Sequence, residues 1–238
     1  MAGLPKTVKD RVNGVINALY LLTHMDAATL SAIYATIAST CYAMAAALVL
    51  GVPLGFLLGH CSFPGKRALR LVSDTLLAFP TVLIGLLVYA FITARGPLGE
   101  YGLLFTLPGM AIGQAVLALP IVVSWTAQAL EDLDPRCRET LLTLGANTRQ
   151  LALYSLWECR YAVGMVCVTA FGRVITEVGV AMMLGGNIRY ATRTMTTAIA
   201  LETSKGDFAQ GIALGLVLLL MAFVVNLALA FFRRRGRA

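Results

Sequence analysis

Long stretches without a charged side chain are the feature that most constrains this chain. From Ala27 to Gly65 there is no Lys, Arg, Asp or Glu, and 13% of the 238 residues are charged, against roughly 25% in a soluble domain. A helix needs about 20 mostly apolar residues to cross the hydrocarbon core of a bilayer. The sequence therefore predicts an all-α, polytopic membrane protein with a single transmembrane domain.

Five segments meet this length criterion, and we expect each to be one transmembrane helix. They lie at residues 31–59, 75–94, 103–130, 161–184 and 208–232. They form a transmembrane domain over residues 31–238, in which a polar loop at 131–160 separates the third and fourth segments.

Residues 1–30 are too short and too charged to supply a further span. Apolar residues recur there at helical spacing, so an amphipathic helix lying in the membrane interface is expected. They are Val8, Val12, Val15, Ile16, Leu19 and Leu22. A leader without a function of its own explains the same pattern. No small-residue cleavage site follows an apolar core, which argues against a removable signal peptide.

Five spans place the two ends of the chain on opposite sides of the membrane. The side that holds the C-terminus and the 131–160 loop carries eleven basic residues, and the other side carries seven. Cytoplasmic loops of membrane proteins are enriched in Lys and Arg. We therefore expect a multi-pass protein of the cell (inner) membrane, with the C-terminus and this loop in the cytoplasm and the N-terminus outside. The net charge of +7 is assigned to these loops and not to nucleic-acid binding.

The 131–160 loop contains the signals of two short helices. Asp134 can cap the first helix, with Pro135 at its first position. Gly145 suits the left-handed residue that ends a helix, and Asn147 or Thr148 can cap a second helix. Such a bent element either presents an apolar edge to a cytoplasmic partner or packs on the ends of the bundle.

Polar residues inside the predicted spans are candidates for a translocation path or gate. Arg173 and Glu177 are four residues apart in the fourth segment, so they share a helix face and can neutralise each other. They line an aqueous path or form a structural pair between helices. Gln114 in the third segment is a further candidate for the path.

The loop between the fourth and fifth segments contains Asn187, Arg189 and Arg193, with threonines at 192, 194, 196 and 197. Arginine and hydroxyl groups donate hydrogen bonds, which suits a tetrahedral oxyanion. They also suit an acidic patch on a binding protein, and an ordinary solvated loop has the same composition.

Signals of catalysis are missing from the sequence. There is no G-x-x-x-x-G-K-[ST] motif, and no Ser/His/Asp or Cys/His set at suggestive spacing. The five cysteines have no CxxC spacing, so no metal site is expected. We predict that the chain is not an enzyme and holds no cofactor, and that ATP and Mg, where used, lie on a partner.

The loop motif resembles that of a known family. Glu139 followed six positions later by Gly145, in a loop before the penultimate span, is similar to the EAA loop of ABC importer permeases, although Thr140 and Leu141 replace the alanines. In that family the loop forms a coupling helix that docks into a groove on the ATPase. The resemblance assigns coupling to a set of five residues: Asp134, Glu139, Leu141, Gly145 and Ala146.

Other segments extend the resemblance to most of the chain and match oxyanion permeases, most closely the tungstate type, with molybdate and sulfate permeases as relatives. They are FPGKR (63–67), residues 96–122, LDPRCRETLLTLGA (133–146), FGRVITEVGVAMMLGGNIR (171–189) and residues 192–219.

This resemblance implies a type I ABC importer-like fold. It further implies a homodimer that works with a cytoplasmic ATPase dimer and an extracytoplasmic oxyanion-binding protein. Two other classes stay open at this point. An ion-driven secondary transporter is disfavoured because Glu177 is the only acidic residue in the spans, whereas a membrane scaffold that transports nothing is not excluded by the 131–160 element.

Overall fold

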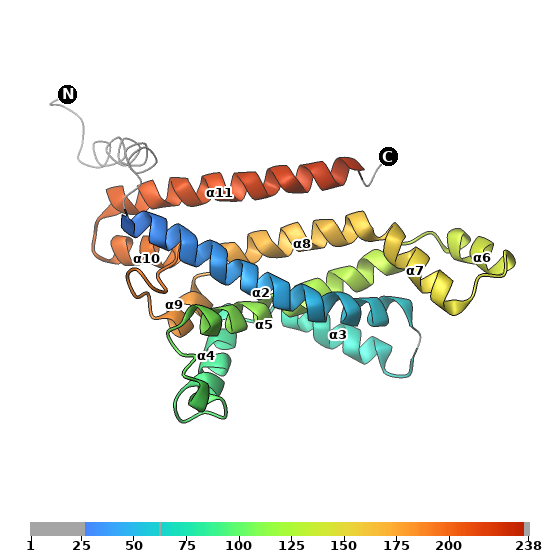
Figure 1. Ribbon diagram of the computed structural model, residues 1–238, viewed down its shortest axis with the longest axis horizontal. Coiled ribbons are helices and arrows are strands. Elements are labelled where there is room, and N and C mark those ends of the chain that lie inside the picture. Colours follow the sequence, from blue (N-terminus) through green and yellow to red (C-terminus); the bar gives the residue numbers. More distant parts are fainter. Residues whose placement is uncertain (1–26, 62, 236–238) are drawn as a thin grey trace.

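The computed structural model describes residues 27–61 and 63–235, and the regular structure within these ranges is helical (Figure 1). The expected all-α class is confirmed for this part of the chain, and the predicted interfacial helix at 1–30 falls almost entirely outside it. The helices are α2 (Ala27–His60), α3 (Lys66–Leu77), α4 (Thr81–Ile92), the 3-10 turn η1 (Gly99–Tyr101), α5 (Leu107–Glu131), α6 (Pro135–Thr143), α7 (Thr148–Glu158), α8 (Arg160–Ile175), α9 (Gly179–Gly185), α10 (Met195–Ser204) and α11 (Phe208–Arg235).

Helices α2 and α5 run side by side in the same direction, in contact through glycine. A Cβ atom placed on Gly51 would lie 2.8 Å from Val122, and one on Gly55 would lie 2.7 Å from Thr126. Further along, a Cβ on Gly59 would lie 2.8 Å from a carbonyl oxygen of α5. Lipid tails are as apolar as leucine, so helices in a bilayer associate mainly by close packing of small residues. The G-x-x-x-G-x-x-x-G repeat of α2 supplies that packing.

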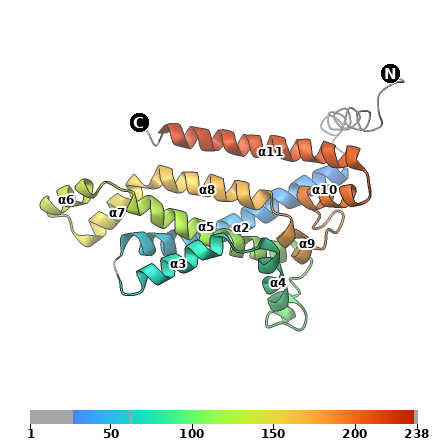
Figure 2. The ribbon, with the colours of Figure 1, turned by 180° about the vertical axis from the view of Figure 1, so that it is seen from behind.

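The other helices assemble on this pair. Helix α8 joins α2 and α5 in one apolar cluster that includes Ala43, Ala118 and Val174. Helices α4 and α9 pack on the first half of α5, and α10 and α11 pack on the first turns of α2. As a result α10 and the start of α11 lie at one end of the long axis, and α6 and α7 lie at the other (Figures 1 and 2).

Large apolar side chains cover the outer faces of several helices, as expected for surfaces that contact lipid. Val49 on α2 is 72% exposed, and Leu219 and Phe223 on α11 are 64% and 63% exposed. Helices α2 and α5 are each long and apolar enough to cross a membrane. The described residues contain two such helices, or up to four if the bent pairs α3–α4 and α7–α8 each count as one span.

The segments at 75–94 and 161–184 are each interrupted, so neither is one continuous helix. In the first, α3 ends at Leu77, α4 begins at Thr81 and the two axes differ by 102°. Pro80 has no N–H to donate, and it disfavours helical backbone at the residue before it. In the second, α8 ends at Ile175 and α9 begins at Gly179. That break is stabilised by Glu177, as described below.

The glycine contact between α2 and α5 predicts a sharp difference between two glycine substitutions. We expect Gly55→Leu to destabilise the fold by about 1–3 kcal/mol, because the added side chain forces the two helices apart. Gly215→Leu on α11 is the matched control, since a Cβ there meets nothing within 4 Å. Thermal unfolding of the purified protein in detergent measures both. Equal losses of stability in the two variants would show that the α2–α5 contact is not close.

Candidate functional site

The α6–α7 element begins and breaks where the local sequence predicts. The Asp134 carboxylate accepts a hydrogen bond from the Arg136 N–H at 2.9 Å and caps α6. Gly145 has φ +81°, the left-handed conformation that glycine adopts without strain. The Gly145 N–H donates to the Leu142 carbonyl at 3.0 Å. The expected helix start at Asp134 and the expected break at Gly145 are therefore confirmed.

Two further contacts fix the shape of this element. The Ala146 N–H donates to the Leu141 carbonyl at 2.9 Å, and with the Gly145 bond it completes a Schellman motif. Of the two expected caps for the second helix, Asn147 is the one used: it forms a capping box with Gln150. The carbonyl and N–H groups at the turn are thereby satisfied by the element itself.

The element presents an apolar edge that the chain itself leaves uncovered. Leu144 is 78% exposed, Leu153 67% and Trp157 66%, and Glu139 on α6 is also exposed. Helix α6 lies beyond the ends of α3, α5 and α8 in both views (Figures 1 and 2). Of the two interpretations offered by the sequence, this placement favours a surface for a partner over a cover for the bundle.

Arg173 and Glu177 form the expected pair, with 3.3 Å between Nη1 and Oε2. Their surroundings differ, because the Glu177 side chain is 4% exposed and that of Arg173 is 50% exposed. Glu177 Oε1 also accepts the N–H groups of Gly179 at 2.8 Å and Val180 at 3.4 Å, at the start of α9. The Thr196 hydroxyl donates to the Glu177 carbonyl at 2.9 Å. Glu177 thus joins α8, α9 and α10, while Arg173 keeps half of its side chain accessible.

Gln114 lies inside the bundle on α5 and is 2% exposed. Its Oε1 atom has no hydrogen-bond partner among the described residues, and the same holds for the buried hydroxyls of Thr40 and Thr126. Gln114 Oε1 therefore makes no hydrogen bond to the Arg173–Glu177 pair.

The loop between α9 and α10 holds its arginines in different ways. Asn187, with φ +53°, accepts a hydrogen bond from Arg193 Nε at 3.1 Å through its side chain and one from Nη2 at 3.3 Å through its carbonyl. The Arg189 guanidinium lies 4.8 Å from the centre of the Tyr190 ring. Asn187 thus positions Arg193, and Arg189 stays exposed.

The threonines of this loop form hydrogen bonds within the protein. Thr194 and Thr197 form the capping box of α10, and Thr192 donates to the Gly185 carbonyl. Thr196 contacts Thr194 and donates to Glu177, as noted above. All four side chains are buried. Their hydroxyls hold the α9–α10 connection together, because buried polar groups need partners within the protein.

An ion-pair network between α3 and α5 was not anticipated. Arg70 Nη1 and Lys66 Nζ each lie 3.2 Å from a Glu131 carboxylate oxygen, and Arg70 Nε lies 3.4 Å from Asp74. The Ser124 hydroxyl donates to Asp74. The four-residue spacing of Arg70 and Asp74 is readable in the sequence, but the contacts to α5 depend on packing. The network fixes α3 to the end of α5 from which α6 departs.

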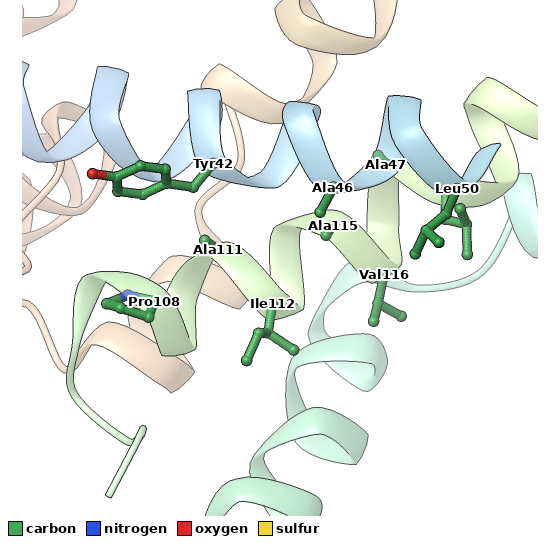
Figure 3. A pocket seen from close by; sticks show the side chains of 10 residues that line it. Tyr42, Ala46, Ala47, Leu50, Pro108, Ala111, Ile112, Ala115 and Val116 are labelled. Carbon is green, nitrogen blue, oxygen red and sulfur yellow. The ribbon is translucent and has the colours of Figure 1, made fainter. Parts of the chain in front are cut away.

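Two hollows along the bundle are apolar. One, of about 530 Å³, lies between α2 and α5 and has Ala46, Ala111 and Ala115 in its lining (Figure 3). The other, of about 770 Å³, is enclosed by α2, α3, α4 and α5. Neither has a charged residue in its lining. A hydrated anion finds no charged partner in either, so these hollows suit lipid chains or helix side chains.

Comparisons with known proteins agree on one class. The family described as "Binding-protein-dependent transport system inner membrane component" matches residues 51–238. The tungstate uptake system permease protein TupB of Campylobacter jejuni is 47% identical over 214 residues, which is 90% of each chain. TupB of Peptoclostridium acidaminophilum is 36% identical over 88% of this chain and 92% of its own.

Among solved structures, an inward-facing methionine ABC transporter, MetNI, superposes with a TM-score of 0.70 at 15% identity, over 88% of this chain and 96% of the other. At that identity the likeness concerns the fold alone, and it confirms the expected ABC importer permease architecture.

The environment of Glu177 predicts different effects for three substitutions. Glu177→Leu leaves the part-buried N–H of Gly179 and the buried N–H of Val180 without this acceptor, which costs about 1–3 kcal/mol. Glu177→Gln keeps an acceptor oxygen and costs less. Arg173→Gln removes a half-exposed partner, and we expect a loss below about 1 kcal/mol. Thermal unfolding measures the loss of stability in each of the three variants. Equal losses of stability for Arg173→Gln and Glu177→Leu would contradict the predicted order.

Proposed function

The chain belongs to the family of binding-protein-dependent transport system inner membrane components, and on this basis we propose that it is the membrane-spanning permease subunit of an ATP-driven tungstate importer. The observation that carries the proposal is 47% identity to a tungstate permease over 90% of both chains. The relatives are transport subunits and not enzymes, so ATP hydrolysis belongs to a separate partner. Molybdate and sulfate are the alternative substrates within the same class.

We propose five membrane crossings, made by α2, the bent pair α3–α4, α5, α8 with α9, and α11. The start of α3, the α6–α7 element and the end of α11 lie at the same end of the molecule (Figures 1 and 2). These are the segments whose basic residues face the cytoplasm in the proposed topology. The start of α2 lies at the opposite end, which supports an N-terminus outside the cytoplasm.

The α6–α7 element is the proposed contact with a cytoplasmic ATPase dimer. Its exposed apolar edge suits insertion into a groove, because apolar area removed from water drives association. Within the coupling set, Asp134 and Gly145 shape the element, Leu141 and Ala146 close its turn and Glu139 faces solvent. The same proposal includes a second copy of this chain and an extracytoplasmic oxyanion-binding protein.

Arg173 and Gln114 are the proposed residues of the translocation path. The half-exposed Arg173 guanidinium carries a charge that Glu177 balances, so a passing anion would meet a donor without being held strongly. Gln114 offers a buried oxygen inside the bundle that has no hydrogen-bond partner among the described residues. Asn187, Arg189 and Arg193 are proposed to meet the anion or its binding protein on the outer side.

Uptake by the reconstituted transporter tests the proposed substrate. Proteoliposomes that contain the permease, its ATPase and its binding protein should accumulate tungstate when ATP is enclosed, and should not do so without ATP. Parallel assays with molybdate and sulfate identify the preferred anion. Full uptake of tungstate by the permease alone, without any ATPase, would show that the chain is a secondary transporter.

The left-handed turn at Gly145 predicts a separation of ATP hydrolysis from transport. Gly145→Val forces a β-branched residue into this conformation, at a cost of about 1–3 kcal/mol, and should distort the docking element. We expect ATPase activity that no longer responds to the binding protein, together with strongly reduced uptake. Gly102→Val is the control, because Gly102 also has positive φ and open space around it but lies away from α6. Wild-type uptake in Gly145→Val would argue against coupling.

A further inference from the structure

A polar cavity of about 240 Å³ lies at the end of the molecule opposite the α6–α7 element. Four segments enclose it: the start of α2, the loop between α9 and α10, the end of α10 with Lys205, and the start of α11. Its lining includes Arg189, Arg193 and Lys205, which are separated in sequence and brought together by the fold. The two larger hollows described above have no charged lining residue, so this cavity differs from them in its charge and polarity.

Positive charge is in excess in this cavity. Glu202 is the acidic residue of the lining, and its carboxylate lies 2.9 Å from Lys205 Nζ. This pair leaves the charges of Arg189 and Arg193 without an acidic partner within the lining. Arg193 uses Nε and Nη2 to hold Asn187, so its Nη1 group is the part of the guanidinium left for a ligand.

Two neutral donors, Thr29 on α2 and Gln210 on α11, belong to the lining together with four apolar residues, Ala28, Ala32, Ala198 and Leu214. Thr29 is 7% exposed. Guanidinium, ammonium, hydroxyl and amide groups all donate hydrogen bonds, and a tetrahedral oxyanion accepts them from several directions at once. A small cation or an apolar ligand would gain nothing from such a set.

We propose that this cavity binds a small tetrahedral oxyanion on the outer side of the membrane. It is the first site on the permease that the anion occupies after release from the binding protein. The inference deepens the proposed function and rests on it for the sidedness of the molecule. A carboxylate of a docked protein is the competing occupant. The lining by four segments and the low exposure of Thr29 favour a small free anion, because Arg189 and Lys205 are exposed whereas Thr29 and Arg193 are less accessible to a docked protein.

Titration calorimetry on the purified permease, without ATPase or binding protein, tests the site. Sodium tungstate is the titrant, at an ionic strength held constant with sodium chloride. Arg193→Gln should weaken binding about ten-fold, the loss of one charge-assisted hydrogen bond. Glu202→Gln should strengthen binding, because it removes the negative charge and frees Lys205, an effect that a merely structural role would not produce. Arg95→Gln is the matched control, since Arg95 is exposed and is not part of this lining.

Three outcomes would overturn the site. Folded wild-type permease that binds none of tungstate, molybdate or sulfate would do so, as would unchanged affinity in both Arg193→Gln and Glu202→Gln. Loss of binding-protein-stimulated ATP hydrolysis in Arg193→Gln with unchanged anion affinity would assign the cavity to protein docking instead. Each leaves the proposed function standing if the assembled transporter still imports an oxyanion. Failure of uptake for all three anions refutes the proposed function itself.

Discussion

Close contact between the backbones of α2 and α5 is the constraint on which the rest of the structure depends. Water drives apolar helices together in a soluble protein, but a bilayer offers no such force, so packing has to come from surfaces that fit. Gly51, Gly55 and Gly59 provide that fit on α2. Helix α8 packs on both members of the pair, α4 and α9 pack on α5, and α10 and α11 pack on α2. Each later helix therefore takes its position from this one contact.

The polar groups discussed above lie at three positions along the helix bundle. The α3–α5 ion pairs and the α6–α7 element occupy one end, and the cavity with Arg189 and Arg193 occupies the other. Between them, Glu177 bridges the break from α8 to α9. Helices α5 and α8 lead from the α6–α7 element toward Glu177, and the Glu177 carbonyl accepts a hydrogen bond from Thr196 on α10, a helix that lines the cavity. A rigid-body shift of α8 is therefore the physical means by which a change at α6 could reach this cavity.

Local signals predicted the α6–α7 element well, and tertiary contacts account for what was missed. Asp134, Gly145 and Asn147 act on N–H and carbonyl groups a few residues away, so their capping follows from the sequence alone. The break at Pro80 was readable in part, but its 102° bend depends on how α3 and α4 pack. The roles of Thr192 and its neighbours stayed open in the sequence, because hydroxyls look alike there whether they face solvent or a buried carbonyl. The network around Arg70 and the cavity around Arg193 both unite residues distant in the chain, and no spacing rule finds those.

The closed turn between α6 and α7 has a mechanical consequence. Its Schellman motif and capping box satisfy the backbone within the turn, so the element keeps its shape before any partner binds. When a partner docks on this element, little conformational entropy is lost. More of the free energy gained by burying the exposed leucines then appears as binding affinity. The rigidity of the turn also matters after docking, because a flexible turn would absorb a displacement of α6, whereas a rigid turn transmits it to α7. Because α6 follows α5 and α7 leads into α8, movement imposed on the turn is delivered to two helices of the bundle at once.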